Sequence, residues 1–158
     1  MRKRSRRQVS DLQLVRSTSV KAGGWTPAFL ASVQSGRVIL VAAVTERATR
    51  PERLAELLVE RVNASDVDGV VALYARDAVL ALPDGQVADG HEAIRRFYAQ
   101  LLDARPTFEP GEQLPALMRG DLALTSTRLV GGGATAEVAR RQPDGTWLWI
   151  IDRPNVIS

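Results

Sequence analysis

The chain of 158 residues contains no cysteine, a single histidine and only two lysines. Without cysteine it can form no disulfide, no thiolate nucleophile and no cysteine-ligated metal site. One histidine, His91, also argues against a zinc or non-haem iron centre. We therefore expect neither a metal nor another cofactor, and a reducing, cytoplasmic location.

Long hydrophobic runs are absent as well. The strongest candidate, Val38 to Val44, is far shorter than the roughly 20 apolar residues that span a bilayer. Charged Glu46 and Arg47 follow it, without the small-residue cleavage site of a signal peptide. We expect neither a membrane segment nor a secretion signal.

Charge is distributed unevenly along the chain. Residues 1–50 hold ten lysines and arginines against two acids, whereas residues 51–158 hold eleven arginines against sixteen acids. The basic head, from Arg2 to Arg7, lacks the interleaved aromatic residues and the motifs of a nucleic-acid-binding arm. We interpret it as a solvated tail and expect no nucleic-acid partner. The preference for arginine over lysine indicates a GC-rich bacterial genome.

The sequence signals of regular secondary structure begin near Thr49. We therefore divide the chain into a basic, irregular or disordered extension at 1–48 and a folded domain at 49–158. One hypothesis is that the natural chain starts at Val44 through a GTG codon, so that residues 1–43 have no evolved partner in the core. Trp25, Phe29 and the apolar run Val38 to Val44 argue for the alternative, an extra strand or helix.

Three amphipathic helices are predicted in the folded domain. The pairs Thr49–Glu52 and Ser65–Asp68 have the spacing of a capping box and begin the first two helices. Asp89 precedes the third. The apolar positions at helical spacing are Leu54, Leu57, Leu58 and Val62 in the first, Val67, Val70, Val71 and Tyr74 in the second, and Ala93, Ile94, Phe97, Tyr98, Leu101 and Leu102 in the third.

Strands are predicted between and after these helices. A short apolar run at 78–82 ends at Pro83, and four further strands are expected within 107–119, 121–130, 134–141 and 146–151. The triple glycine 131–133 joins two of them as a hairpin, because no helix follows it as a phosphate-binding loop would require. Three helices followed by an antiparallel meander predict an α+β domain.

Four segments carry a resemblance to a known family: VNASDVDGVVALYARDAVLALPDG, GHEAIRRFYAQLL, GDLALTSTRLVGG and PDGTWLWIIDRP. They resemble the SnoaL-like and ketosteroid-isomerase-like proteins of the nuclear-transport-factor-2-like superfamily, over residues 52–155. The resemblance implies a cone-shaped, curved antiparallel sheet packed on three helices that enclose an apolar pocket. It also implies a homodimer that forms through the sheet.

The resemblance can be carried over residue by residue. The catalytic base of ketosteroid isomerases falls on Leu82, and the tyrosine of their oxyanion hole falls on Leu58. Leucine neither transfers a proton nor donates a hydrogen bond, so we expect no ketosteroid isomerisation by the family mechanism. Tyr98 matches a supporting tyrosine of the oxyanion network, and Glu137 falls near the neutral acid. The alternative is that Tyr98 is a core aromatic residue with its hydroxyl satisfied and that Glu137 is an ion-pair partner on the sheet surface.

The last strand and a neighbouring arginine add two candidates. Asp152 is either a pocket acid or a structural acid paired with Arg153 or another arginine. Arg128 shares strand parity with Leu122 and Leu124, so it either faces the cavity or forms a surface ion pair. Alternation in the last strand predicts two apolar faces, one toward the pocket and one toward a second subunit, with Leu148, Ile150 and Asp152 opposite Trp147, Trp149 and Ile151.

Two functions stay open at this point. The first is a module that binds a small apolar ligand in its pocket, and the alternative is a cofactor-independent acid–base enzyme acting on a small carbonyl metabolite. The candidate catalytic residues are Glu137, Asp152 and Tyr98. The residues expected to contact the ligand are Leu58, Tyr74, Leu82, Phe97 and Arg128.

Overall fold

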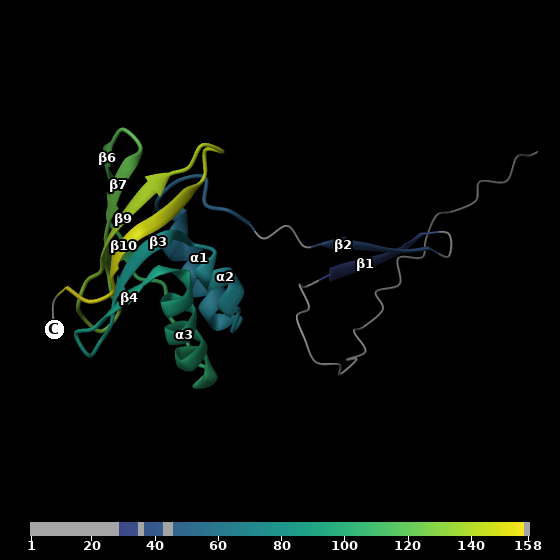
Figure 1. Ribbon diagram of the computed structural model, residues 1–158, viewed down its shortest axis with the longest axis horizontal. Helices are drawn as coiled ribbons and strands as arrows, with labels where there is room; N and C mark the ends of the chain where they lie inside the picture. Colours follow the sequence, from purple (N-terminus) through teal and green to yellow (C-terminus); the bar gives the residue numbers. More distant parts are fainter. Residues whose placement is uncertain (1–28, 35–36, 43–45, 157–158) are drawn as a thin grey trace, which may run out of the picture. The chain divides into compact units, whose positions relative to one another are not determined.

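The computed structural model describes residues 29–34, 37–42 and 46–156 (Figure 1). The chain divides into two compact units, Met1–Val44 and Thr45–Ser158. In the first unit, β1 (Phe29–Gln34) and β2 (Arg37–Ala42) pair as an antiparallel hairpin. This hairpin includes most of the apolar run for which the sequence left an extra strand open. The basic head of the extension lies outside the described residues.

The second unit begins with two helices, α1 (Arg53–Asn63) and α2 (Val67–Val71). The predicted capping boxes are wrong. The carboxylate of Glu52 accepts a hydrogen bond from the backbone N–H of Ala116 at 3.4 Å rather than capping α1. Asp66, one residue after the predicted cap Ser65, accepts from the backbone N–H of Gly69 at 2.8 Å and caps α2.

Six strands form the main sheet in the order β4-β3-β10-β9-β7-β6. The β3–β10 pair is parallel and the other pairs are antiparallel. A separate short ladder joins β5 to β8. The bounds are β3 (Tyr74–Ala81), β4 (Val87–Asp89), β5 (Glu112–Gln113), β6 (Leu117–Arg119), β7 (Leu122–Thr125), β8 (Thr127–Arg128), β9 (Ala136–Arg141) and β10 (Trp147–Arg153).

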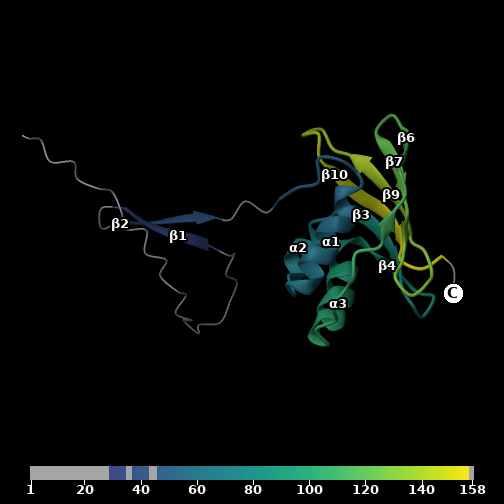
Figure 2. The same ribbon diagram turned by 180° about the vertical axis from the view of Figure 1, so that it is seen from behind.

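The helices cover one face of this sheet, and the other face is left open in the domain (Figures 1 and 2). The third helix, α3 (Gly90–Asp103), starts where it was predicted. The second helix is shorter than predicted, because α2 ends at Val71 and Tyr74 already begins β3. β4 was not predicted, since three residues after a turn carry too little periodicity to identify a strand.

A β-bulge in β10 decides which of its residues face inward. Trp149 lies opposite Ala139 of β9 and Ile151 lies opposite the preceding residue, Val138, so Ile150 is left over between them. The bulge reverses the alternation. Trp149 and Asp152 are therefore both buried, while Ile151 is exposed. The predicted faces of the last strand are wrong beyond Ile150.

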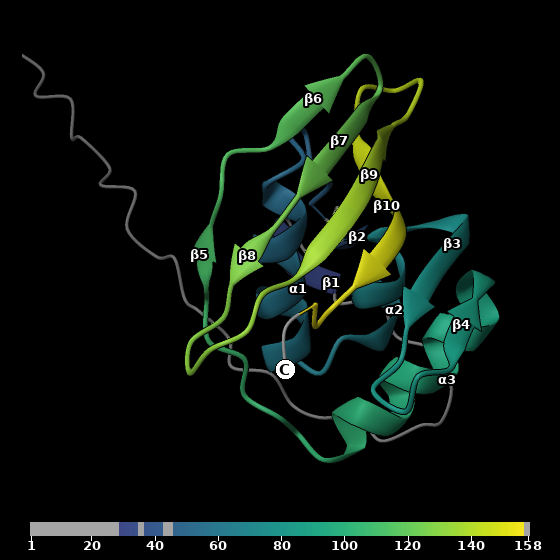
Figure 3. The same cartoon turned by 90° about the vertical axis from the view of Figure 1, so that its left-hand side faces the viewer.

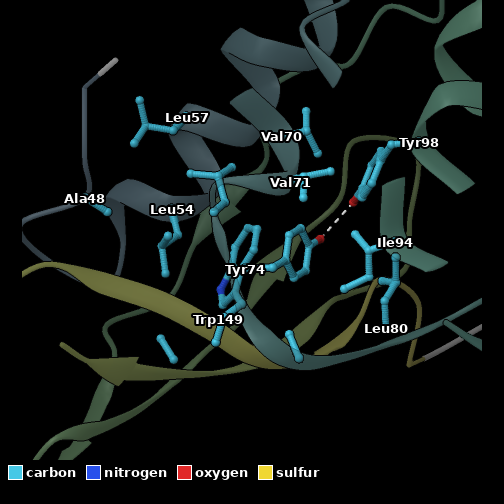
Figure 4. Close-up of a cluster of buried hydrophobic side chains, with 14 of the residues drawn as sticks. Ala48, Leu54, Leu57, Val70, Val71, Tyr74, Leu80, Ile94, Tyr98 and Trp149 are labelled. Atoms are coloured by element: carbon cyan, nitrogen blue, oxygen red, sulfur yellow. Dashed lines mark hydrogen bonds between the residues drawn. The ribbon is translucent and has the colours of Figure 1, made fainter. Parts of the chain in front are cut away.

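The core lies between the helices and the inner face of the sheet (Figure 4). Leu54 of α1 and Ile94 of α3 are fully buried and belong to one cluster with Tyr74 and Trp149. The rings of Tyr74 and Trp149 lie 5.3 Å apart between centroids, at a tilt of 54°. This contact joins the first residue of β3 to the centre of β10.

Within 29–34, 37–42 and 46–156, none of the helices has both the length and the apolar character needed to cross a bilayer.

Candidate functional site

A cavity of about 1100 Å³ lies between the helices and the inner face of the sheet. α1, α3, β3 and β10 contribute to its lining, together with the segment that precedes β5. Most of the predicted site residues lie in this lining: Leu58, Leu82 and Phe97 among the ligand-contacting set, and Tyr98, Glu137 and Asp152 among the catalytic set.

Arg128 does not line the cavity, so the structure does not place it where its predicted contact with a ligand would require it. In β7 the buried residues are Ala123 and Thr125, whereas Leu122 and Leu124 are exposed. Arg128 shares the outward parity and forms an exposed ion pair with Glu112 at 3.3 Å. This is the surface pair that the sequence left open as the alternative.

Tyr74 and Tyr98 link the inner wall of the cavity to Asp152. The Tyr74 hydroxyl donates a hydrogen bond to Oδ2 of Asp152 at 2.5 Å. The hydroxyls of Tyr74 and Tyr98 lie 2.8 Å apart (Figure 4). A phenol carries one hydrogen, so Tyr98 donates to Tyr74, which donates to Asp152. Tyr74 thus contacts the site only through Asp152 and Tyr98, because it is fully buried and lies outside the cavity lining.

Asp152 is a buried acid whose pKa lies near neutrality. Burial raises the pKa of Asp152 to about 7, and the negative charge of Glu137 adds to the effect. The hydrogen bond from Tyr74 opposes this rise because it favours the carboxylate. At pH 7 both protonation states of Asp152 are therefore populated. None of the ion pairs among the described residues includes Asp152, so the structure gives the predicted alternative, a structural pair with Arg153 or another arginine, no support.

Glu137 lies directly opposite Asp152 in the β9–β10 ladder. Only 4% of each residue is exposed. Oε2 of Glu137 accepts a hydrogen bond from the Thr125 hydroxyl at 2.7 Å. Burial raises the pKa of Glu137, and the hydroxyls of Thr135 and Thr125 oppose the rise. The cavity thus holds two neighbouring acids whose pKa values are both raised by burial.

The sequence missed the supporting hydroxyls of Tyr74, Thr125 and Thr135. Alternation in the strands places Thr125 and Glu137 inward, but only the pairing of β7 with β9 brings them into contact. His91 is half-buried, and its Nε2 lies 2.7 Å from the carbonyl oxygen of Tyr74. It therefore joins α3 to β3 and does not line the cavity. No three histidine, aspartate or glutamate side chains among the described residues are grouped as metal ligands.

Replacing Tyr74 with phenylalanine is expected to raise the pKa of Asp152 above about 7. The variant loses a hydrogen bond to the charged carboxylate, which corresponds to a shift of about one unit. Carboxyl ¹³C chemical shifts followed through a pH titration measure the change. Tyr98→Phe is the matched control, because Tyr98 contacts Tyr74 and not Asp152. An equal shift in the two variants would contradict the direct role of Tyr74.

Comparisons with known proteins extend this description. A family model for a SnoaL-like domain matches residues 55–153. A Thiobacillus denitrificans domain, described as a calcium/calmodulin-dependent protein kinase type II association domain, is 17% identical with a TM-score of 0.59, covering 68% of this chain and 95% of its own. No curated protein matches the chain.

Two further solved structures have the same fold. A Streptomyces avermitilis protein of the NTF2-like family, described as a dehydratase, is 17% identical with a TM-score of 0.54 and covers 68% of this chain and 94% of its own. A ketosteroid isomerase-like protein from Erwinia carotovora atroseptica is 20% identical with a TM-score of 0.53 and covers 64% and 88%. At these identities the likeness establishes the cone fold predicted from the sequence.

Proposed function

Because the chain belongs to the family of SnoaL-like domains, we propose that its cavity binds a small, largely apolar molecule whose polar group meets Asp152. The observation that carries this proposal is a cavity of about 1100 Å³ with a buried acid in its wall. Ligand sites are typically concave and mainly apolar, with a few well-placed polar groups. Leu58, Leu82 and Phe97 supply the apolar wall here, and Tyr98 contributes a hydroxyl.

Proton transfer is the second candidate function, and the near-neutral pKa of Asp152 favours it. A general acid or base is most effective when its pKa lies close to the working pH. Leu82 and Leu58 occupy the positions of the ketosteroid isomerase base and oxyanion tyrosine, so such chemistry would depend on Asp152. When protonated, Asp152 would donate to a carbonyl oxygen of the substrate. When ionised, it would accept a proton from the adjacent carbon.

A fragment screen by NMR tests the binding proposal. Leu82→Trp places a large ring in the wall of the cavity and is expected to abolish binding of the fragments that bind the parent. Ala99→Trp is the control, because Ala99 is exposed on α3 and outside the cavity lining. Equal binding by the two variants would contradict the assignment of the cavity as the ligand site.

Deuterium exchange separates the binding module from the enzyme. Carbonyl fragments that bind are incubated with the protein in D₂O, and deuterium at the carbon next to the carbonyl is measured by mass spectrometry. Catalysed exchange that Asp152→Asn abolishes would establish proton transfer. Exchange no faster than in buffer would leave ligand binding as the function.

We also propose that a second copy of the chain covers the outer face of the sheet. This face is turned toward the viewer in Figure 3. Four apolar residues lie in register across it: Ile151 opposite Val138, Val138 opposite Leu124, and Leu124 opposite Leu117. Leu117 is 70% exposed and Ile151 is 51% exposed. A row of this kind can pack against its own copy around a two-fold axis. The tryptophans of β10 face inward and contribute nothing to this surface.

Replacing Leu124 with lysine is expected to convert the dimer into a monomer, because two buried ammonium groups would lie near the two-fold axis. Light scattering after size-exclusion chromatography measures the mass. Leu129→Lys, at an exposed leucine outside the row, is the control and should leave the dimer intact. A monomeric parent at micromolar concentration would overturn the proposal.

A further inference from the structure

The two buried acids of the cavity have no cationic partner among the described residues. Asp152 and Glu137 face each other across β9 and β10, and none of the ion pairs in the described part of the chain includes either of them. The donors that contact them are neutral hydroxyls, from Tyr74, Thr125 and Thr135. Buried carboxylates are normally paired with a cation, because desolvation of an isolated charge is costly.

The other charged groups of the lining do not supply this cation. Glu56 of α1 is an acid, and Arg53 binds it at 2.8 Å. Glu109 is a further acid, in the exposed segment before β5. Arg153, the single arginine of the lining, is exposed. The charged groups around the cavity are thus four acids and one arginine, and the two most buried are acids.

We propose that the ligand of this cavity carries a protonated amine, which binds between the carboxyl groups of Asp152 and Glu137. The inference rests on the proposed function and names the polar group of the ligand. An ammonium group supplies the cationic partner that both buried acids lack. An apolar body fits against the wall formed by Leu58, Leu82 and Phe97. A carboxylate or phosphate at this position would be repelled by both acids.

Proton linkage distinguishes an amine from a carbonyl at this position. An ammonium group favours the ionised acids, so its binding at pH 7 releases protons from the protein. A carbonyl oxygen needs a donor, so its binding favours protonated Asp152 and takes protons up. The pKa of Asp152, about 7, makes both responses measurable at neutral pH. An alkylamine, with a pKa near that of lysine, stays protonated throughout.

Four compounds with one rigid apolar body test the proposal: 1-adamantylmethylamine, 1-adamantanemethanol, 1-acetyladamantane and 1-adamantanecarboxylate. Titration calorimetry at pH 7, in two buffers with different heats of ionisation, gives the affinity and the number of protons exchanged. The amine is expected to bind at least about tenfold more tightly than the alcohol and to release protons. The carboxylate is expected to bind most weakly.

Isosteric variants connect this preference to the two acids. Asp152→Asn and Glu137→Gln keep the size of each side chain, and each is expected to reduce the amine-to-alcohol affinity ratio by about tenfold. Asp152→Asn should also remove most of the proton release. Glu92→Gln, which neutralises an exposed acid on α3 outside the cavity lining, is the control and should leave the ratio unchanged.

The outcomes separate the inference from the proposed function. If the alcohol or the ketone binds as tightly as the amine, and Leu82→Trp abolishes that binding, the amine is wrong and the cavity remains a ligand site. If the amine preference persists in both isosteric variants, the assignment to Asp152 and Glu137 is overturned. If none of the four compounds binds, or if Leu82→Trp leaves all binding unchanged, both proposals fail.

Discussion

At pH 8 the Asp152→Asn variant is expected to be more stable than the parent by up to about 4 kcal/mol. The folded state raises the pKa of Asp152 to about 7, whereas an unfolded aspartate titrates near 3.9. The folded protein therefore binds this proton more tightly, and the stability that it confers is present below about pH 4 and is lost as the pH rises to about 7. Asparagine stays neutral throughout and still accepts the hydrogen bond from Tyr74.

Urea unfolding of parent and variant at intervals from pH 4 to pH 8 measures this effect. The quantity of interest is the difference in unfolding free energy between the two proteins, since Glu46 and Asp144 have lowered pKa values and weaken both proteins in acid. The difference should be small at pH 4 and reach its maximum above pH 7. Asp103→Asn, at an exposed acid, should show no such rise. A constant difference across the range would contradict the raised pKa of Asp152.

The same comparison bears on the function of the site. An acid that destabilises its own fold at neutral pH is a cost that a purely structural residue would not impose. Calorimetry of the adamantyl series and the pH dependence of stability therefore both test whether the carboxyl group of Asp152 serves ligand binding. If Asp152→Asn is both more stable and unable to discriminate the amine, the carboxyl group serves the ligand rather than the fold.

Replacing Trp149 with alanine is expected to lower the unfolding free energy by about 3–5 kcal/mol. Trp149 is 1% exposed, packs on Tyr74 and donates its backbone N–H to the carbonyl oxygen of Leu73 at 2.9 Å. Alanine would leave a void at the centre of the sheet, next to the cavity that Trp149 helps to line. Chemical denaturation followed by far-UV circular dichroism measures the loss.

Trp149→Phe separates the packing of this residue from its polar group. The indole Nε1 of Trp149 is buried without a hydrogen-bond partner among the described residues. Phenylalanine removes that unsatisfied donor while it keeps an aromatic ring against Tyr74, so the expected loss is only about 1 kcal/mol. A phenylalanine variant as unstable as the alanine variant would show that the indole makes a contact beyond packing.

The helices show how far local pattern reaches in this chain. α1 and α3 follow from apolar residues at helical spacing, and both buried faces agree with that pattern. The capping residues could not be predicted in this way. Several side chains near the start of a helix have suitable chemistry for capping, and the tertiary structure decides which of them caps the helix. Asp66 caps α2, while Glu52 binds the backbone of Ala116, 64 positions further along.

The location of the chain in the cell and the absence of a nucleic-acid partner rest on composition alone and stay predictions. Homodimer formation and the roles of Glu137, Asp152 and Tyr98 likewise stay predictions.

The sequence by itself determined the α+β class and the SnoaL-like family, because apolar periodicity and motif order are local properties. Only the tertiary structure decided how the site is assembled. The bulge at Ile150 turns Asp152 inward, and the β9–β10 register places it opposite Glu137. Arg128 faces outward because β7 and β8 bury the opposite parity. Bulges and registers arise from pairing between distant strands, so they leave no signal within the strand itself.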